Sequence, residues 1–369
     1  MTMKIAFELD QLIYYPRNGI SVYFYHLLQQ LLAQRTACRL VYATLKIREA
    51  AAATIDFVDT EKCLLPLPGR LFAIPFLSKI AQHYFLKNTD LFHAVSGILP
   101  TWYRKRGALI VTIHDMVPFR DQQNNQTDAS NTWYQTEMKR AVTLADRVIT
   151  VSEFTKQELC DLLPVNPCKV TVVPIASQFS PEQFQTKQPL PPALQNKKYF
   201  LAVSTLSPRK NYETLLKAWQ LFYPHNRDCL LVIVGRCGWK CDRLLGDMQH
   251  TPGLLYYKEM ATDRLLSLYQ HASGFFNLSV YEGFGIPLLE AMNCGVPCCY
   301  ASGSAMDEIC GNAGIAVTAC DVNAVVEIMK IFFDDDASLA PLRELALKRS
   351  RRFNWELTAG MTRQIYHAI

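Results

Sequence analysis

Short apolar runs rich in valine, isoleucine and aromatic residues alternate with amphipathic stretches along the whole chain. Buried parallel strands have continuous apolar sequences, and the helices that connect them carry one apolar face. The alternation therefore predicts an α/β protein built from βα units around parallel sheets. The expected strands form two series, near 3–9, 38–44, 90–95, 108–113, 147–151 and 170–174, and near 199–204, 229–234, 254–258, 274–278, 297–301 and 315–318.

A chain of 369 residues is long for one hydrophobic core and sufficient for two. Prolines and glutamines are concentrated between the two series of strands, where they disfavour both helix and central strand. We therefore expect an N-terminal domain over 1–178, a linker over 179–198 and a C-terminal domain over 199–353. The tail, 354–369, has a helical pattern.

The composition argues against several classes of protein. Half of the residues are apolar and 19% are charged, which disfavours a disordered chain. The net charge of +5 is small and dispersed, so no nucleic-acid partner is expected, whereas a small anionic ligand or an anionic membrane surface fits. The start of the chain lacks a leader pattern, and no apolar run is long enough for a spanning helix. We expect a cytoplasmic protein, with a peripheral position at the inner face of the cytoplasmic membrane as the alternative.

The twelve cysteines are scattered without CxxC pairs, which predicts buried reduced thiols rather than disulfides. The pairs Cys237 with Cys241 and Cys294 with Cys298 come nearest to a metal-binding spacing. Neither pair has a histidine close by, so we expect ordinary core cysteines and no metal site.

Two nucleotide-binding motifs are missing. No GxGxxG follows the first expected strand, and the P-loop pattern GxxxxGK[ST] does not occur. Nicotinamide chemistry and the P-loop class of nucleoside triphosphatases are therefore disfavoured.

The most informative stretch is SVYEGFGIPLLEAMNCGVP, residues 279–297. A glycine-broken turn leads into a helix expected to begin near Ile286 and Pro287, where the missing N–H of proline costs nothing. A helix N-terminus offers free backbone N–H groups and the positive end of its dipole, and Gly285 has no side chain to block a ligand. The pattern predicts an anion site.

Two carboxylates frame this expected anion site. Glu282 lies in the turn, and Glu290 lies on the helix eight positions later. This spacing suits two groups that accept hydrogen bonds from different hydroxyls of one extended ligand. It does not by itself make them the acid and base of one hydrolytic reaction.

The stretch 279–297 resembles the E-x7-E region of retaining GT-B glycosyltransferases, specifically glycosyltransferase family 4. Further segments resemble the family in the same order: NGISVYFYHLLQQLL, DLFHAVSGILP, VTIHDMVPF and RVITVSEFTKQEL, then FLAVSTLSPRKNYETLLKAW, LLVIVGRCGW, LLYYKEMATDRLLSLYQHA and SGSAMDEICGNAGI. The likeness covers most of the chain. It implies a GT-B fold, with two Rossmann-like domains whose parallel sheets face a central cleft, and a terminal helix, 354–369, that crosses back to the first domain.

The resemblance also implies roles for individual residues. Arg209 and Lys210 would bind the diphosphate of a nucleotide sugar, because a guanidinium and an ammonium group can neutralise an anionic leaving group. Glu290 would accept hydrogen bonds from the ribose, and Glu282 would contact the transferred sugar near the reacting centre. Backbone N–H groups would contact the donor sugar and phosphates at Phe284, Gly285 and Ile286.

In the first half of the chain, His114 ends an expected strand, at the edge where α/β sheets place groups that face a ligand. The resemblance puts it against the donor sugar as a catalytic residue. Gly19 resembles the family's glycine that lets the backbone approach the donor phosphate or the acceptor, although an ordinary glycine at a helix start is the alternative. His93 ends a similar strand and receives no chemical role, and Asp115 is interpreted as orienting its loop.

The donor is expected to be GDP-mannose, because SVYEGFGIPLLEAM and the later SGSAMDEICGNAG are similar to bacterial mannosyltransferases that build O-antigen or other surface polysaccharides. Other nucleotide sugars stay open. The resemblance places recognition of the base around Gly235, Arg236 and the segment 258–260, where this sequence departs from the family's glycine-containing pattern.

The activity implied is transfer of a hexose, mannose, to a glycan or lipid-linked glycan acceptor, with retention at the anomeric carbon. No cofactor or metal ion is expected, because cationic side chains and a helix dipole would stabilise the leaving diphosphate. Two alternatives stay open: a GT-B enzyme of another reaction, such as an epimerase or phosphorylase, and a non-catalytic protein that binds sugar nucleotides.

One segment, 67–87, mixes large apolar residues with Arg70, Lys79 and Lys87. Such a stretch is more often a helix packed in the core. The alternative is contact with a lipid-linked acceptor at a membrane surface.

Overall fold

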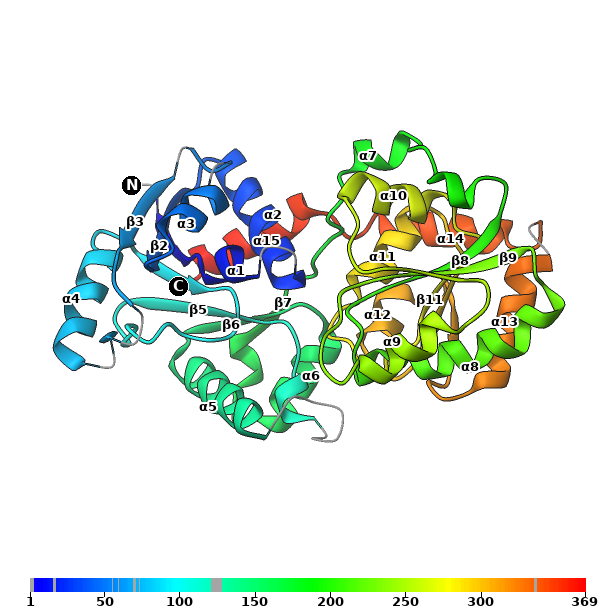
Figure 1. Cartoon of the computed structure of the whole chain (residues 1–369). Helices are drawn as coiled ribbons and strands as arrows, with labels where there is room; N and C mark the ends of the chain where they lie inside the picture. The colour runs from blue at the N-terminus through cyan, green and yellow to red at the C-terminus, as the bar shows by residue number, and fades with distance from the viewer. Residues whose placement is uncertain are drawn as a thin grey trace. The chain divides into compact units, whose positions relative to one another are not determined.

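The computed structural model describes residues 3–15, 18–54, 56–58, 60–68, 71–72, 74–120, 128–334 and 337–369. The chain divides into two compact units, each with its own parallel sheet (Figure 1). Within the described residues, the first unit comprises 3–120, 128–176 and Asn354–Ile369, and the second comprises Ser177–Phe353. No helix in these described ranges is both long and apolar enough to cross a membrane.

The sheet of the first unit has the strand order β3-β2-β1-β4-β5-β6-β7, with every pair parallel. Its strands are β1 (Lys4–Glu8), β2 (Ala37–Ala43), β3 (Glu61–Leu65), β4 (Leu91–Ala94), β5 (Ala108–Ile113), β6 (Arg147–Thr150) and β7 (Val170–Val172). The sequence patterns predicted all of them except β3. This edge strand begins with the exposed residues Glu61 and Lys62, which remove the apolar run that marks a buried strand.

Helices cover both faces of the first sheet. They are α1 (Asp10–Tyr14), α2 (Gly19–Ala33), α3 (Ile47–Ala53), α4 (Pro75–Leu86), α5 (Asp128–Leu144), α6 (Glu153–Leu162) and α15 (Trp355–His367), with 3-10 turns at Val117–Phe119 and Pro167–Lys169. One core lies between the sheet and α4, α5 and α6, and it includes Phe85, Met138 and Leu159.

The terminal helix, α15, packs beside α2 in the first unit (Figure 1). The ring of Trp355 stacks on His26 with centroids 5.1 Å apart, and Thr358 Oγ1 donates to the carbonyl oxygen of Pro174 at 2.7 Å. The hydroxyl of Tyr366 hydrogen-bonds to Nδ1 of the fully buried His93 at 2.7 Å. The last helix is therefore an integral layer of this unit.

The second sheet has the order β10-β9-β8-β11-β12-β13, again parallel throughout. Its strands are β8 (Lys198–Val203), β9 (Cys229–Val234), β10 (Leu254–Tyr257), β11 (Gly274–Asn277), β12 (Cys298–Ala301) and β13 (Ile315–Val317). The apolar runs predicted every one of these strands. The chain builds β8, β9 and β10 toward one edge and then returns to place β11 on the other side of β8.

Two separate cores lie on the two faces of the second sheet, one containing Trp219 and Phe332 and the other Tyr269 and Met292. The helices that cover these cores are α7 (Pro181–Gln185), α8 (Tyr212–Phe222), α9 (Asp242–Gln249), α10 (Thr262–His271), α11 (Ile286–Asn293), α12 (Ala305–Cys310), α13 (Val322–Asp334) and α14 (Ala340–Ser350). The described residues of this unit also form 3-10 turns at Pro192–Leu194, Pro208–Lys210 and Tyr223–His225.

The structure corrects the expected linker, because 179–198 belongs to the second unit. Phe179 and Leu194 are buried in the same core as Tyr269. The prolines do not keep this segment extended: Pro181 and Pro192 each occupy the first position of a short helix, where no N–H is required.

The structure also corrects the expectation of reduced thiols at one pair. Cys237 and Cys241 form a disulfide, because the turn that joins them brings their Cα atoms to 5.9 Å, a distance that a disulfide can span. A carboxylate oxygen of Asp242 lies within 4.8 Å of both sulfur atoms. The other ten cysteines are free, as predicted, but Cys168 and Cys320 are exposed rather than buried.

Candidate active site

The candidate site of the second unit lies where the strand order reverses, at the carboxyl ends of β8 and β11. Ligands of open α/β sheets bind at such a point because the two loops leave in opposite directions and open a crevice between them. The loop after β8 carries Arg209 and Lys210, and the loop after β11 carries Glu282. The topology therefore brings together three of the predicted site residues.

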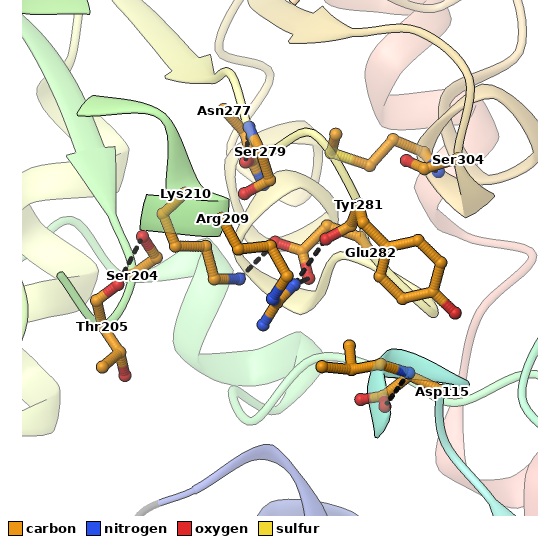
Figure 2. A network of polar contacts seen from close by, with 12 residues as sticks. Asp115, Ser204, Thr205, Arg209, Lys210, Asn277, Ser279, Tyr281, Glu282 and Ser304 are labelled. Atoms are coloured by element: carbon orange, nitrogen blue, oxygen red, sulfur yellow. Dashed lines mark hydrogen bonds and ion pairs between the residues drawn. The ribbon is translucent and has the colours of Figure 1, made fainter. Parts of the chain in front are cut away.

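Figure 2 shows the side chains of Lys210 and Arg209 directed at the carboxylate of Glu282. Nζ of Lys210 contacts Oε1 of Glu282, and Nη1 of Arg209 lies 3.3 Å from Oε2. The same Arg209 nitrogen donates to the carbonyl oxygen of Tyr281, and the backbone N–H of Val280 donates to the Arg209 carbonyl at 2.9 Å. Main-chain and side-chain bonds together hold the two loops against each other.

The loop after β8 is shaped by its own sequence. Pro208 starts the 3-10 turn that contains both cations, and Asn211 then adopts a left-handed conformation with φ of 54° before α8 begins. Asparagine tolerates this conformation better than most residues do. The hydroxyl of Tyr212 lies 2.8 Å from Oγ of Ser204, which ties the start of α8 to the end of β8.

Electrostatics keep Glu282 charged. Burial would raise the pKa of this carboxyl, but the adjacent Lys210 and Arg209 outweigh burial and lower it to about 2. The cluster thus holds two positive charges and one negative charge, and all three side chains are at least four-fifths buried. A shielded net positive charge suits an anionic ligand.

The turn before α11 has the geometry that the sequence predicted. Gly285 is the N-cap of the helix with φ of 100°, a left-handed conformation that favours glycine, and a Cβ there would lie 3.2 Å from Cγ of Met306. The helix begins at Ile286, as expected. The ring of Phe284 is buried against Phe353, so only the backbone of Phe284 is available to a ligand, as its expected role requires.

Glu290 lies on α11 and is only 1% exposed. Burial raises the pKa of its carboxyl to about 7, against the lowering effect of hydrogen bonds from Gln178 and Tyr269. Nε2 of Gln178 donates to Oε1 of Glu290 at 2.9 Å. Burial therefore favours the protonated form of this carboxyl more than in an exposed glutamate, and its contact with a ribose stays a prediction.

The two segments expected to recognise the base are brought together. Nε of Arg236 lies 2.9 Å from Oε1 of Glu259, with both side chains about half exposed. A Cβ on Gly235 would lie 1.8 Å from the carbonyl oxygen of Ser204, so only glycine fits where the loops after β8 and β9 touch. Their contact with a base remains a prediction.

In the first unit, His114 follows β5 as expected. Its Nε2 donates to the carbonyl oxygen of Val95 at 2.8 Å, and its ring makes a T-shaped contact with the ring of Tyr23, with centroids 4.9 Å apart. Burial lowers the pKa of His114, which favours a neutral ring. Because the proton is on Nε2, Nδ1 is an acceptor available for a ligand hydroxyl.

The structure also places the other residues that the sequence singled out in the first unit. Gly19 is exposed at the start of α2, next to its capping residue Asn18, and its approach to a donor phosphate stays a prediction. Oδ1 of Asp115 accepts a hydrogen bond from the backbone N–H of Val117 at 3.1 Å, which orients the loop. His93 is buried between Tyr366 and Thr112 and is structural.

Sequence reasoning missed two polar residues of the second unit. Asn277 ends β11 beside the cation cluster and is buried, and its Nδ2 has no partner among the described residues. Asn277 is a polar residue at the carboxyl end of an apolar strand. The same pattern identified His114, so it could have identified Asn277 as well. Gln178, the partner of Glu290, gave no such signal because it lies in the glutamine-rich segment 112 positions away.

Comparison with known proteins assigns the chain to a family. The family model described as Glycosyltransferase Family 4 matches residues 17–176, and the model described as Glycosyl transferases group 1 matches residues 184–350. The O-antigen chain mannosyltransferase B of Escherichia coli is 30% identical over 100% of both chains. The chain belongs to glycosyltransferase family 4. Another relative of this family 4 glycosyltransferase is the O-antigen chain mannosyltransferase RfbU of Salmonella typhimurium, 24% identical over 57% of each chain.

Solved structures identify the fold of this family 4 glycosyltransferase. The HepE protein of Anabaena in complex with UDP-glucose matches with a TM-score of 0.75 and 18% identity over 100% of both chains. Sucrose-phosphate synthase from Thermosynechococcus elongatus matches with a TM-score of 0.74 and 20% identity over 99% of this chain and 98% of the other. Together with the two parallel-sheet units, these likenesses confirm the predicted GT-B fold.

Proposed function

We propose that this glycosyltransferase transfers mannose from GDP-mannose to a glycan or lipid-linked glycan acceptor during synthesis of a bacterial surface polysaccharide. The observation that carries the proposal is the buried cluster of Arg209, Lys210 and Glu282 at the reversal point of the second sheet. The choice of mannose is supported by the full-length relative, which is an O-antigen chain mannosyltransferase. A relative in Corynebacterium glutamicum, 29% identical over 42% of this chain and 43% of its own, is GDP-mannose-dependent.

In the proposed reaction the bond between the anomeric carbon and the diphosphate oxygen breaks, and the leaving diphosphate gains negative charge. Lys210 and Arg209 would stabilise this charge together with the N-terminus of α11, where Gly285 leaves the backbone N–H groups accessible. The charge on Glu282 keeps both cations oriented before the donor binds. The Glu282 carboxylate would also accept hydrogen bonds from hydroxyls of the transferred sugar.

We further propose that the reaction retains the anomeric configuration. The acceptor hydroxyl would attack from the face that the diphosphate leaves, and a donor phosphate oxygen would take its proton. His114 would be the residue of the first unit that contacts the donor sugar, with Nδ1 as the acceptor. Because the positive charge comes from side chains and a helix dipole, the reaction would need no metal ion.

The nucleotide can be tested separately from the transfer. The full chain is mixed with GDP, UDP or ADP, and the thermal unfolding midpoint is measured at increasing ligand concentration. A ligand that binds only the folded state raises the midpoint. We expect the largest increase with GDP, and a larger increase with UDP would replace GDP-mannose as the proposed donor.

The transfer is tested with GDP-mannose and an alkyl α-mannoside acceptor, with and without EDTA, and the product linkage is determined by NMR. We expect an α-linked mannose in both reactions. An inverted linkage would reject the retaining mechanism. Activity that requires a metal ion would reject the proposal that side chains and a helix dipole alone stabilise the leaving diphosphate. Epimerised donor, a sugar phosphate, or binding without turnover would instead indicate an epimerase, a phosphorylase or a non-catalytic binding protein.

A further inference from the structure

Helix α4 of the first unit is buried on one face only (Figure 1). Ser78, Ala81, Gln82 and Phe85 are its buried residues, and their spacing of three and four places them on one side of the helix. The ring of Phe85 packs on Trp102 with centroids 4.9 Å apart. The expectation that 67–87 packs in the core is therefore met by one face of this helix.

The opposite face carries a row of large apolar side chains. Phe76, Ile80 and Tyr84 follow one another at intervals of four and are 69%, 50% and 45% exposed. Residues at this spacing are neighbours along a helix surface, so the three form a continuous stripe. Single exposed apolar residues are common on soluble proteins, but a contiguous apolar patch marks a site of interaction.

A row of basic residues runs beside this stripe. Lys79, His83 and Lys87 are exposed and have the same spacing of four, and all six side chains line one hollow of the surface. The sequence contains no aspartate or glutamate between residues 62 and 89. The outer face of α4 thus carries apolar and basic side chains and no acidic one. Arg70, which the sequence grouped with these lysines, lies outside the described residues.

The helix is held firmly from its inner side. Gln82 Nε2 donates to the carbonyl oxygen of Arg104, and the backbone N–H of Arg104 donates to Gln82 Oε1, both at 2.7 Å. Nη1 of the buried Arg39 donates to the carbonyl oxygens of Phe85, at 3.2 Å, and Lys87 at the end of the helix. The stripe therefore points outward without any rearrangement of the core.

We propose that the outer face of α4 docks on an anionic lipid bilayer. Phe76 and Ile80 would enter the boundary between headgroups and acyl chains, and the hydroxyl of Tyr84 would stay at the headgroup level. The ammonium groups of Lys79 and Lys87 would contact lipid phosphates. A second copy of the chain fits less well, because a two-fold contact through this face would bring its cations against the same cations.

The docking is tested by sedimentation of the full chain with vesicles of phosphatidylglycerol or of phosphatidylcholine. We expect strong binding to phosphatidylglycerol that weakens with added salt, and little binding to phosphatidylcholine. The double variant Phe76→Ser/Ile80→Ser and the double variant Lys79→Ser/Lys87→Ser should each bind roughly tenfold more weakly or worse. Leu221→Ser is the matched control, since Leu221 is 54% exposed on α8 of the second unit.

A second measurement does not rely on loss of binding. The variant Phe76→Trp keeps an apolar ring and adds one tryptophan, whose emission is obtained by subtracting the wild-type spectrum. With phosphatidylglycerol vesicles this emission should shift to shorter wavelength, and brominated lipid chains should quench it. Equal binding by the α4 variants and the control, or no quenching, would overturn the proposal. Gel filtration that shows a dimer dispersed by Phe76→Ser/Ile80→Ser would assign the face to a second copy and would also overturn it.

Discussion

The ammonium group of Lys210 contacts Oε1 of Glu282, although the two residues are 72 positions apart in the chain. They meet because β8 and β11 are neighbours in the sheet and their loops leave from the same edge. The side chains are only 12% and 11% exposed, so each charge depends on the other for compensation. Because Arg209 also pairs with Glu282, removing Lys210 leaves the buried carboxylate with one cation. Removing Glu282 takes the carboxylate away from both buried cations, which is more costly than never burying the cluster.

Replacing either cation of the cluster should reduce turnover. We expect Lys210→Ala or Arg209→Ala to lower kcat by roughly 100-fold or more, because each removes a contact that strengthens as charge develops on the diphosphate. The measurement is steady-state transfer from the donor identified by thermal shift. Lys217→Ala, which changes an exposed lysine on α8, is the control and should match wild type. Wild-type kcat in both cluster variants would remove the phosphate role.

The low pKa of Glu282 predicts an acid-dependent loss of stability. Its pKa is about 2 in the folded chain and near 4.5 when the residue is unperturbed, so the pairing stabilises the folded state above about pH 4.5 and is lost as the pH falls toward 2. The difference amounts to about 3 kcal/mol at most. Urea unfolding of wild type and Glu282→Gln between pH 3 and pH 7 should show wild type losing its advantage as the pH falls. Parallel curves would contradict the prediction.

The pKa of Glu290 is shifted in the opposite direction, so its effect on stability has the opposite dependence on pH. Its folded pKa of about 7 exceeds the usual 4.5, so the folded state binds the proton more tightly, and stability falls as the pH rises from about 4.5 to about 7. The fall should reach about 3 kcal/mol and be absent in Glu290→Gln, as measured by urea unfolding from pH 4.5 to pH 8. Glu213→Gln, at an exposed position on α8, serves as control.

Donor affinity gives a separate test of Glu290. The proposed ribose contacts exist before and during the reaction, so Glu290→Ala should mainly weaken nucleotide binding, whereas Glu282→Ala should mainly lower kcat. Isothermal titration with the nucleoside diphosphate measures the first effect. Equal affinity for wild type and Glu290→Ala would remove the ribose assignment.

The terminal helix should contribute to the stability of the first unit through Tyr366. Tyr366→Phe removes the hydroxyl that bonds to Nδ1 of His93 and leaves that buried nitrogen without this partner, at a cost of about 1–3 kcal/mol. Urea unfolding followed by tryptophan fluorescence measures the loss. His367→Ala changes the next, exposed residue and should have little effect. If Tyr366→Phe and wild type have the same free energy of unfolding, this hydrogen bond makes no net contribution to stability.

Local patterns predicted most of the fold, and the exceptions have clear causes. The apolar runs identified the central strands because these are buried on both faces, whereas the edge strand β3 begins with Glu61 and Lys62 and was missed. The prolines of 179–198 were interpreted as preventing regular structure. Pro181 and Pro192 instead start short helices, whose burial against the second core depends on residues far away in the chain.

The sequence by itself determined the strand series, the turn at Gly285, the start of α11 at Ile286 and the types of residue in the site, because these depend on neighbours within a few positions. Only the tertiary structure decided which of these residues meet. The ion pair of Lys210 with Glu282 and the bond from Gln178 to Glu290 join residues 72 and 112 positions apart. The pKa values of the two glutamates differ for the same reason. Glu282 is buried beside two cations, whereas Glu290 is buried beside neutral groups, and packing alone sets that difference.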